Sequence, residues 1–142
     1  MINRRNSLFA IVLSMILMSS LVFASCASKP DNLESFLKSN EDVKADIDAA
    51  AESAGMTVEV KGNDVIYTYD LSTIDGVTED MLKDEAMINT LQSSLDSMES
   101  TFVDTCKKLE EETGFTGIQM IVNFTYGDEV LVTQTFTSGG KA

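Results

Sequence analysis

The 142-residue sequence contains no histidine, no tryptophan, one proline and two cysteines. Without histidine there is no Ser-His-Asp or Cys-His catalytic site, and the commonest zinc ligand is missing. Basic residues are also scarce, because ten lysines and arginines stand against 23 aspartates and glutamates, for a net charge of −13. A surface of that sign repels nucleic acid. The composition therefore excludes histidine-dependent enzymes and argues against a nucleic-acid ligand.

The first thirty residues have the pattern of an export signal. Arg4 and Arg5 precede an apolar segment, residues 8–23, which serine interrupts at three positions. This segment is shorter than the roughly 20 apolar residues of a membrane-spanning helix, and small residues follow it. We therefore expect residues 1–25 to be a signal peptide that is removed on export.

Cys26 directly follows two small residues, Ala24 and Ser25. The stretch FASC resembles the lipobox of bacterial lipoproteins, in which the cysteine is diacylated and the chain is cut just before it, although Phe23 stands where leucine is usual. The resemblance implies that Cys26 carries lipid, and two acyl chains hold a protein stably on a bilayer. The alternative is an ordinary secretory cut that leaves Cys26 as a free thiol.

Removal of residues 1–25 leaves 117 residues, which is the size of one small domain. It takes away two arginines and no acid, so the net charge changes from −13 to −15. If Cys26 is acylated, Cys106 is the only remaining thiol, and no intramolecular disulfide can form. We expect a short tether at 26–31, a single domain at 32–137 and a flexible tail at 138–142.

Hydrophobic periodicity predicts the order helix, hairpin, long helix, hairpin. Alternating residues on both sides of Gly62-Asn63 predict a first hairpin that pairs Val60 with Val65 and Val58 with Tyr67. Residues 78–113 predict one long helix, with a possible bend in its serine-rich middle. Residues 117–136 predict a second hairpin, whose apolar even-numbered positions match if the turn holds three or five residues. The expected fold class is α+β: a four-stranded, mainly antiparallel sheet with helices packed on one face.

Few side chains are candidates for chemistry. Cys106 lies on the apolar stripe of the predicted long helix, so we expect it in the core rather than at an active site. The acids around residues 70–80 lack the spacing of an EF-hand, which leaves an irregular calcium site as the open alternative. We expect no catalytic residue, no metal and no cofactor, and hence not an enzyme.

The strand residues that would face away from the helices are the remaining candidates. Ile66, Ile121 and Leu131 are large aliphatic residues on an otherwise threonine-rich face. An exposed apolar patch of this kind is typical of a partner-binding surface. The alternative is that isoleucine and threonine are simply good strand formers.

The stretch DNLESFLKSNEDVKADIDAAAESAGMTVEVKGNDVIYTYDL, the long helix and its closing hairpin, together with the lipobox, resemble a family of short Gram-positive lipoproteins with an uncharacterised domain. The resemblance implies an extracytoplasmic domain, lipid-anchored to the cell membrane, but no activity. We therefore expect a non-enzymatic binding module with an unknown protein or envelope partner and no nucleic acid. The paired helix–hairpin units also resemble the β-lactamase inhibitor protein family in architecture, so the alternative is an inhibitor-like module acting on an envelope or secreted enzyme. The sequence indicates no oligomeric state.

Overall fold

The computed structural model describes residues 30–142. The predicted signal peptide 1–25, with Ala24 and Ser25, and the predicted lipid site Cys26 lie outside the described residues. The elements, in chain order, are α2 (Leu33–Lys38), α3 (Glu41–Ser53), β1 (Met56–Lys61), β2 (Asp64–Asp70), the 3-10 turn η1 (Leu71–Thr73), α4 (Glu79–Leu82), α5 (Glu85–Ser97), α6 (Glu99–Thr113), β3 (Gln119–Tyr126), β4 (Glu129–Thr137) and β5 (Gly140–Lys141).

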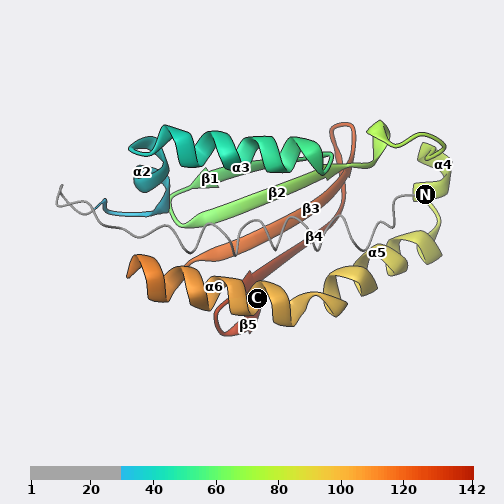
Figure 1. The fold of residues 1–142 in the computed structure, drawn as a ribbon. Coiled ribbons are helices and arrows are strands. Elements are labelled where there is room, and N and C mark those ends of the chain that lie inside the picture. The colour runs from blue at the N-terminus through green and yellow to red at the C-terminus, as the bar shows by residue number, and fades with distance from the viewer. Residues whose placement is uncertain (1–29) are drawn as a thin grey trace.

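The described strands form one mixed sheet in the order β1-β2-β3-β4-β5 (Figure 1). The α+β class is confirmed, but the prediction of four strands is wrong. Gly140 and Lys141 pair with β4 where a flexible tail was expected. The central pair β2–β3 is parallel, because α4, α5 and α6 carry the chain back along the sheet between these two strands. The other pairs are antiparallel.

The first hairpin has the register that the sequence predicted. Val60 lies opposite Val65, and Val58 lies opposite Tyr67. Gly62 takes a φ of +60°, which suits the first position of a two-residue type II′ turn. The alternation of apolar and polar residues therefore determined the pairing here.

The second hairpin differs from its prediction in the turn. The turn between β3 and β4 holds two residues, Gly127 and Asp128, and not three or five. A β-bulge beside Phe124 takes up the extra residue instead, so that Phe124 still lies opposite Val132. Val130, expected on the apolar face, lies beyond the bulge opposite Thr125 and is 56% exposed.

The prediction of one long helix is also wrong. Asp84 begins a new helix after α4, because its Oδ1 accepts a hydrogen bond from the Ala86 N–H at 3.0 Å. Met98 separates α5 from α6 within the serine-rich segment where a bend was expected. In Figure 1, α5 and α6 follow one another along the lower edge, and α4 lies at the right-hand end of the domain.

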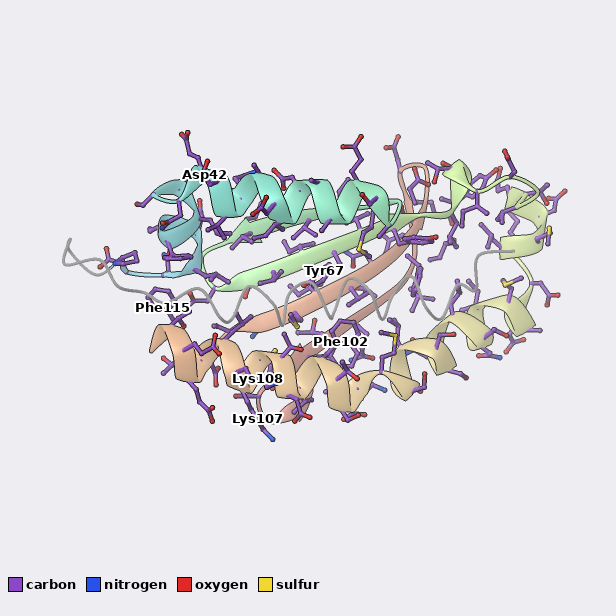
Figure 2. The ribbon with its side chains drawn as sticks, viewed as in Figure 1. Asp42, Tyr67, Phe102, Lys107, Lys108 and Phe115 are labelled. Carbon is purple, nitrogen blue, oxygen red and sulfur yellow. The ribbon has the colours of Figure 1, made fainter. Side chains whose placement is uncertain are left out.

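The core lies between the helices and one face of the sheet. Phe102 of α6 stacks on Phe136 of β4, with ring centroids 4.7 Å apart, and lies 6.4 Å from the ring of Tyr67. Figure 2 shows Tyr67 and Phe102 inside this layer, while Lys107 points away from the sheet. The most deeply buried side chains all belong to this layer: Val65, Leu95, Cys106, Ile118, Met120, Val122 and Phe136.

Candidate functional site

The structure brings two of the three predicted binding residues together. Ile66 of β2 lies opposite Ile121 of β3 in the parallel register, and both are half-buried. Leu131 is the residue at the bulge of β4, and it packs against the core cluster. Val130 lies opposite Thr125 on that face instead. The aliphatic patch therefore consists of Ile66 and Ile121, and Val130 lies apart from it, opposite a residue four positions along β3 from Ile121.

These residues belong to the sheet surface that faces away from the helices, called the open face below. No helix of the described chain packs on it. Strand register defines its members: Thr57, Glu59 and Lys61 of β1, Asp64, Ile66, Thr68 and Asp70 of β2, Gln119, Ile121, Asn123 and Thr125 of β3, and Val130, Thr133, Thr135 and Thr137 of β4.

The open face carries little of the charge of the molecule. Helices α2 to α6 hold fifteen of the 23 acidic residues of the chain and four of its basic residues. The open face holds three acids and Lys61, which forms an ion pair with Glu59 at 3.2 Å. Threonine hydroxyls supply half of its polar side chains, as where Thr133 donates to Asn123 Oδ1 at 2.6 Å. The net charge of the open face is thus 1 − 3 = −2, against 4 − 15 = −11 for the helices.

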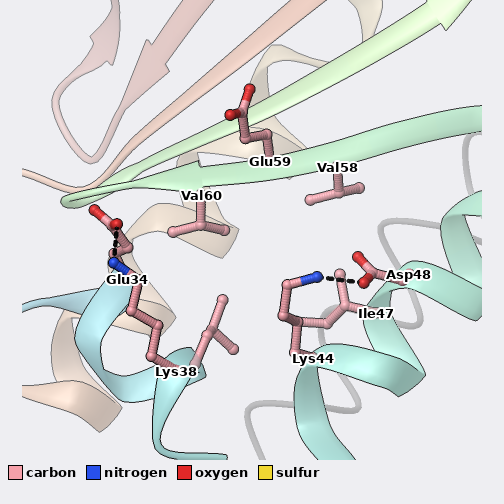
Figure 3. Close-up of a pocket in the computed structure, with 9 residues that line it drawn as sticks. Glu34, Lys38, Lys44, Ile47, Asp48, Val58, Glu59 and Val60 are labelled. Atoms are coloured by element: carbon pink, nitrogen blue, oxygen red, sulfur yellow. Dashed lines mark hydrogen bonds and ion pairs between the residues drawn. The ribbon is translucent and has the colours of Figure 1, made fainter. Parts of the chain in front are cut away.

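A cavity lies on the helix side of β1, between α2 and α3 (Figure 3). This cavity of about 160 Å³ has an apolar floor that includes Ile47, Val58 and Val60. The charged groups around it are paired, Glu34 with Lys38 and Lys44 with Asp48. It therefore offers apolar contact but no free nucleophile.

The thiol of Cys106 has no access to a substrate. Cys106 is completely buried, and its Sγ lies 3.7 Å from the backbone carbonyl oxygen of Phe136. Burial, followed by the nearby charge of Glu110, raises the pKa of the thiol to about 11. A buried, protonated thiol is a poor nucleophile, so this geometry agrees with a place in the core.

The comparisons with known proteins give a family but no activity. A family described as Domain of unknown function (DUF4854) matches residues 33–136. The chain belongs to this family. No curated protein and no solved structure matches the chain.

Asp70, one of the acids of this DUF4854 domain that were weighed as a calcium site, takes part in its loop structure. Asp70 Oδ1 accepts hydrogen bonds from the Ser72 N–H at 2.9 Å and the Gly127 N–H at 3.1 Å. Bonds to Ser72 and then to Gly127 lower the pKa of this carboxyl below its usual range. Within residues 30–142, no three acidic or cysteine side chains gather as a metal site would require.

Asn63 and Asp70 connect parts of the DUF4854 domain that are distant in sequence. The Asn63 Oδ1 accepts from the Leu33 N–H at 3.0 Å, and its Nδ2 donates to the Thr116 carbonyl at 3.0 Å. Asn63 was assigned to a turn and Asp70 to a loop, because local sequence carries no signal for these long-range contacts.

Over the described range, no helix has both the length and the hydropathy that crossing a membrane requires.

Proposed function

We propose that this chain is a non-enzymatic binding module held by lipid on the outer face of the cell membrane. The export pattern of residues 1–25 and the small residues before Cys26 support the anchor. Anchoring by two acyl chains needs no membrane-spanning helix. The protein is then a domain with one fixed end and a surface left free for a partner.

The open face is the proposed contact surface. The observation that carries this assignment is the contrast between the net charge of −2 on the open face and that of −11 on the helices. Interface centres are depleted of charged residues, and a neutral surface costs little to desolvate. Ile66 and Ile121 lie side by side at the middle of this face, where the two central strands pair in parallel.

The tether places limits on where the partner lies. Between Cys26 and Asp31 the chain reaches about 17 Å when fully extended. The folded part therefore stays close to the bilayer and meets partners at or near the membrane surface.

The anchor is tested by replacing the thiol. Cys26→Ser removes the only atom to which the lipid can be attached, so the protein is expected to leave the membrane fraction. Cell fractionation followed by immunoblotting measures the change. Membrane association that survives the substitution would contradict the anchor.

The open face is tested in the native membrane by crosslinking. Ile66→Thr together with Ile121→Thr keeps β-forming residues in both strands and removes the aliphatic patch. We expect the crosslinked partner to be lost, while the matched variant Val103→Thr, which changes a half-buried apolar residue of α6 outside the sheet, retains it. Equal crosslinking in both variants would remove the open face as the contact surface.

A second candidate function follows from the same architecture. Two helix–hairpin units share one continuous sheet whose far face is free of described helices, an arrangement that suits gripping the surface of an enzyme. On this reading the partner is an envelope or secreted hydrolase, and binding inhibits it. Assays of envelope hydrolases with and without the purified protein decide between inhibition and simple binding.

A further inference from the structure

A small apolar pocket lies at the end of the domain where β2 leaves the sheet. It has a volume of about 100 Å³, and the side chains of η1, α4, α5 and the loop between them line it. The apolar lining consists of Leu71, Val77, Met81, Leu82, Met87 and Leu91. An apolar cavity of about 150 Å³ takes a benzene molecule, so this pocket has room for one aliphatic side chain.

Met81 makes the pocket accessible from outside. Its side chain is 45% exposed, and Met81 and Val130 are the two exposed large hydrophobic residues of the described chain. Methionine is flexible and polarizable, so it adapts to apolar side chains of different shapes. A pocket with such a residue at its mouth is suited to an incoming apolar group.

The surroundings of the pocket are strongly acidic. Lys83 is the only basic residue within 70–85 and 127–129. It forms an ion pair with Glu79 at 2.7 Å, and the hydrogen bond to Glu79, followed by the charges of Glu79, Asp80 and Glu129, raises its pKa. The β3–β4 turn belongs to the same end, because Gly127 donates to Asp70. The acids of this end are Asp70, Asp75, Glu79, Asp80, Asp84, Glu85, Asp128 and Glu129.

The pocket and the tether lie at opposite ends of β2. The Glu34 N–H of α2 donates to the Gly62 carbonyl at 2.9 Å, which places α2 beside the turn that precedes β2. The pocket begins at Leu71, directly after β2 ends. Seven strand residues span about 23 Å, so the acidic end is distant from the chain that leads to Cys26. Figure 1 shows α2 and α4 at opposite ends of the domain.

We propose that this pocket, called the acidic-end pocket, docks a basic polypeptide segment through one aliphatic side chain. The apolar lining takes the side chain, and the surrounding carboxylates attract lysines or arginines on either side of it. A second copy of this chain does not fit as the partner, because it is itself strongly acidic and would be repelled by the carboxylates around the pocket. This proposal rests on the proposed function in one respect only: a lipid at Cys26 would turn the pocket away from the membrane.

The test uses the full chain in phosphatidylcholine nanodiscs, or free in buffer if it does not associate with them. The probes are fluorescent 12-residue peptides that hold four lysines and one leucine in a glycine-serine background, with the spacing varied. We expect binding by fluorescence anisotropy for at least one spacing. Leu→Ser in that peptide is expected to weaken binding about tenfold, and about 0.5 M salt is expected to weaken it further.

Variants of the protein locate the site. Met81→Ser is expected to weaken binding about fivefold, while Val103→Ser, at a half-buried residue of α6, leaves it unchanged. Asp75→Asn with Asp80→Asn is expected to weaken binding, while Asp42→Asn with Asp46→Asn, on α3, changes the net charge equally and has a smaller effect.

Three results would overturn the proposal: no binding of any peptide at millimolar concentration, equal loss in the two charge-matched double variants, or binding of spermine with the same sensitivity to Met81→Ser. None of them bears on the anchor, because Cys26→Ser tests the anchor separately. The open face is likewise tested by its own variants.

Discussion

The two helix–hairpin units, α3–β1–β2 and α6–β3–β4, have the same kind of hairpin turn but differ in how they pack. Each turn begins with a glycine of positive φ, +60° at Gly62 and +58° at Gly127. In each, the glycine N–H donates to a carboxylate from a neighbouring segment, Glu34 at 2.7 Å and Asp70 at 3.1 Å. Similar local sequence has therefore produced similar local structure.

Packing separates the units because they occupy different places in the sheet. In the second unit Ile118 and Phe136 are completely buried, and Phe136 stacks on Phe102. In the first unit Val58 and Val60 are half-buried above the cavity of about 160 Å³. β1 is an edge strand, so part of its apolar face has no neighbour. Val65 of β2 is completely buried, so the difference belongs to β1: the position of a strand in the sheet, and not the turn of its hairpin, decides how much it contributes to the core.

The largest predicted effect contrasts the two cores directly. Phe136→Ala removes a fully buried ring and is expected to lower the free energy of unfolding by about 3–5 kcal/mol. Val58→Ala, over the cavity of the first unit, is expected to cost about 1 kcal/mol. Urea unfolding followed by circular dichroism measures both, and equal costs would contradict the difference in packing.

A smaller effect is expected where the two units are joined. Asn63→Ala removes the hydrogen bonds to Leu33 and Thr116 and is expected to cost about 1–2 kcal/mol. Asp128→Ala changes the matching position of the second turn, which is exposed, and is expected to cost about 0.5 kcal/mol or less. If the two variants lost the same stability, Asn63 would act only as a turn residue.

The smallest effect concerns the carboxylates that hold the turns. The hydrogen bond from Lys38 and then that from Gly62 lower the pKa of Glu34, and bonds to Ser72 and Gly127 lower that of Asp70. A lowered folded-state pKa stabilises the protein above the unfolded-state pKa, and this contribution is lost as the pH falls through the folded-state value.

Urea midpoints measured from neutral to acid pH test this contribution of Glu34 and Asp70 to stability. Glu34→Gln and Asp70→Asn are expected to lower stability near neutral pH, and their difference from the wild type is expected to shrink as the pH falls below about 4. A difference that stays constant with pH would show that the two carboxylates act by shape and not by charge.

Local patterns predicted the first unit better than the second. Alternation around Gly62-Asn63 was sufficient for the register of β1 and β2, because the apolar face is buried and a shift by one residue would expose it. The bulge beside Phe124 has no such signal, since an extra residue in a strand leaves composition unchanged. The end of α4 at Lys83 and the break at Met98 fall within a continuous apolar stripe, so periodicity alone joined three helices into one.

The candidate surface was predicted in part for a related reason. The alternation of side chains along each strand placed Ile66 and Ile121 on the face away from the helices. Their contact depends on β2 lying beside β3, and strand order depends on tertiary packing. The acidic-end pocket was not predicted, because periodicity joined α4 and α5 into one helix and so hid the break between Leu82 and Met87, which both line the pocket.

The proposed membrane-anchored binding module depends most on the lipid at Cys26, and the intact mass of the mature protein purified from its native membrane tests for that lipid directly. We predict a chain that begins at Cys26 and carries the added mass of a diacylated cysteine. A chain that begins at another residue, or an unmodified Cys26, would contradict the membrane-anchored binding module.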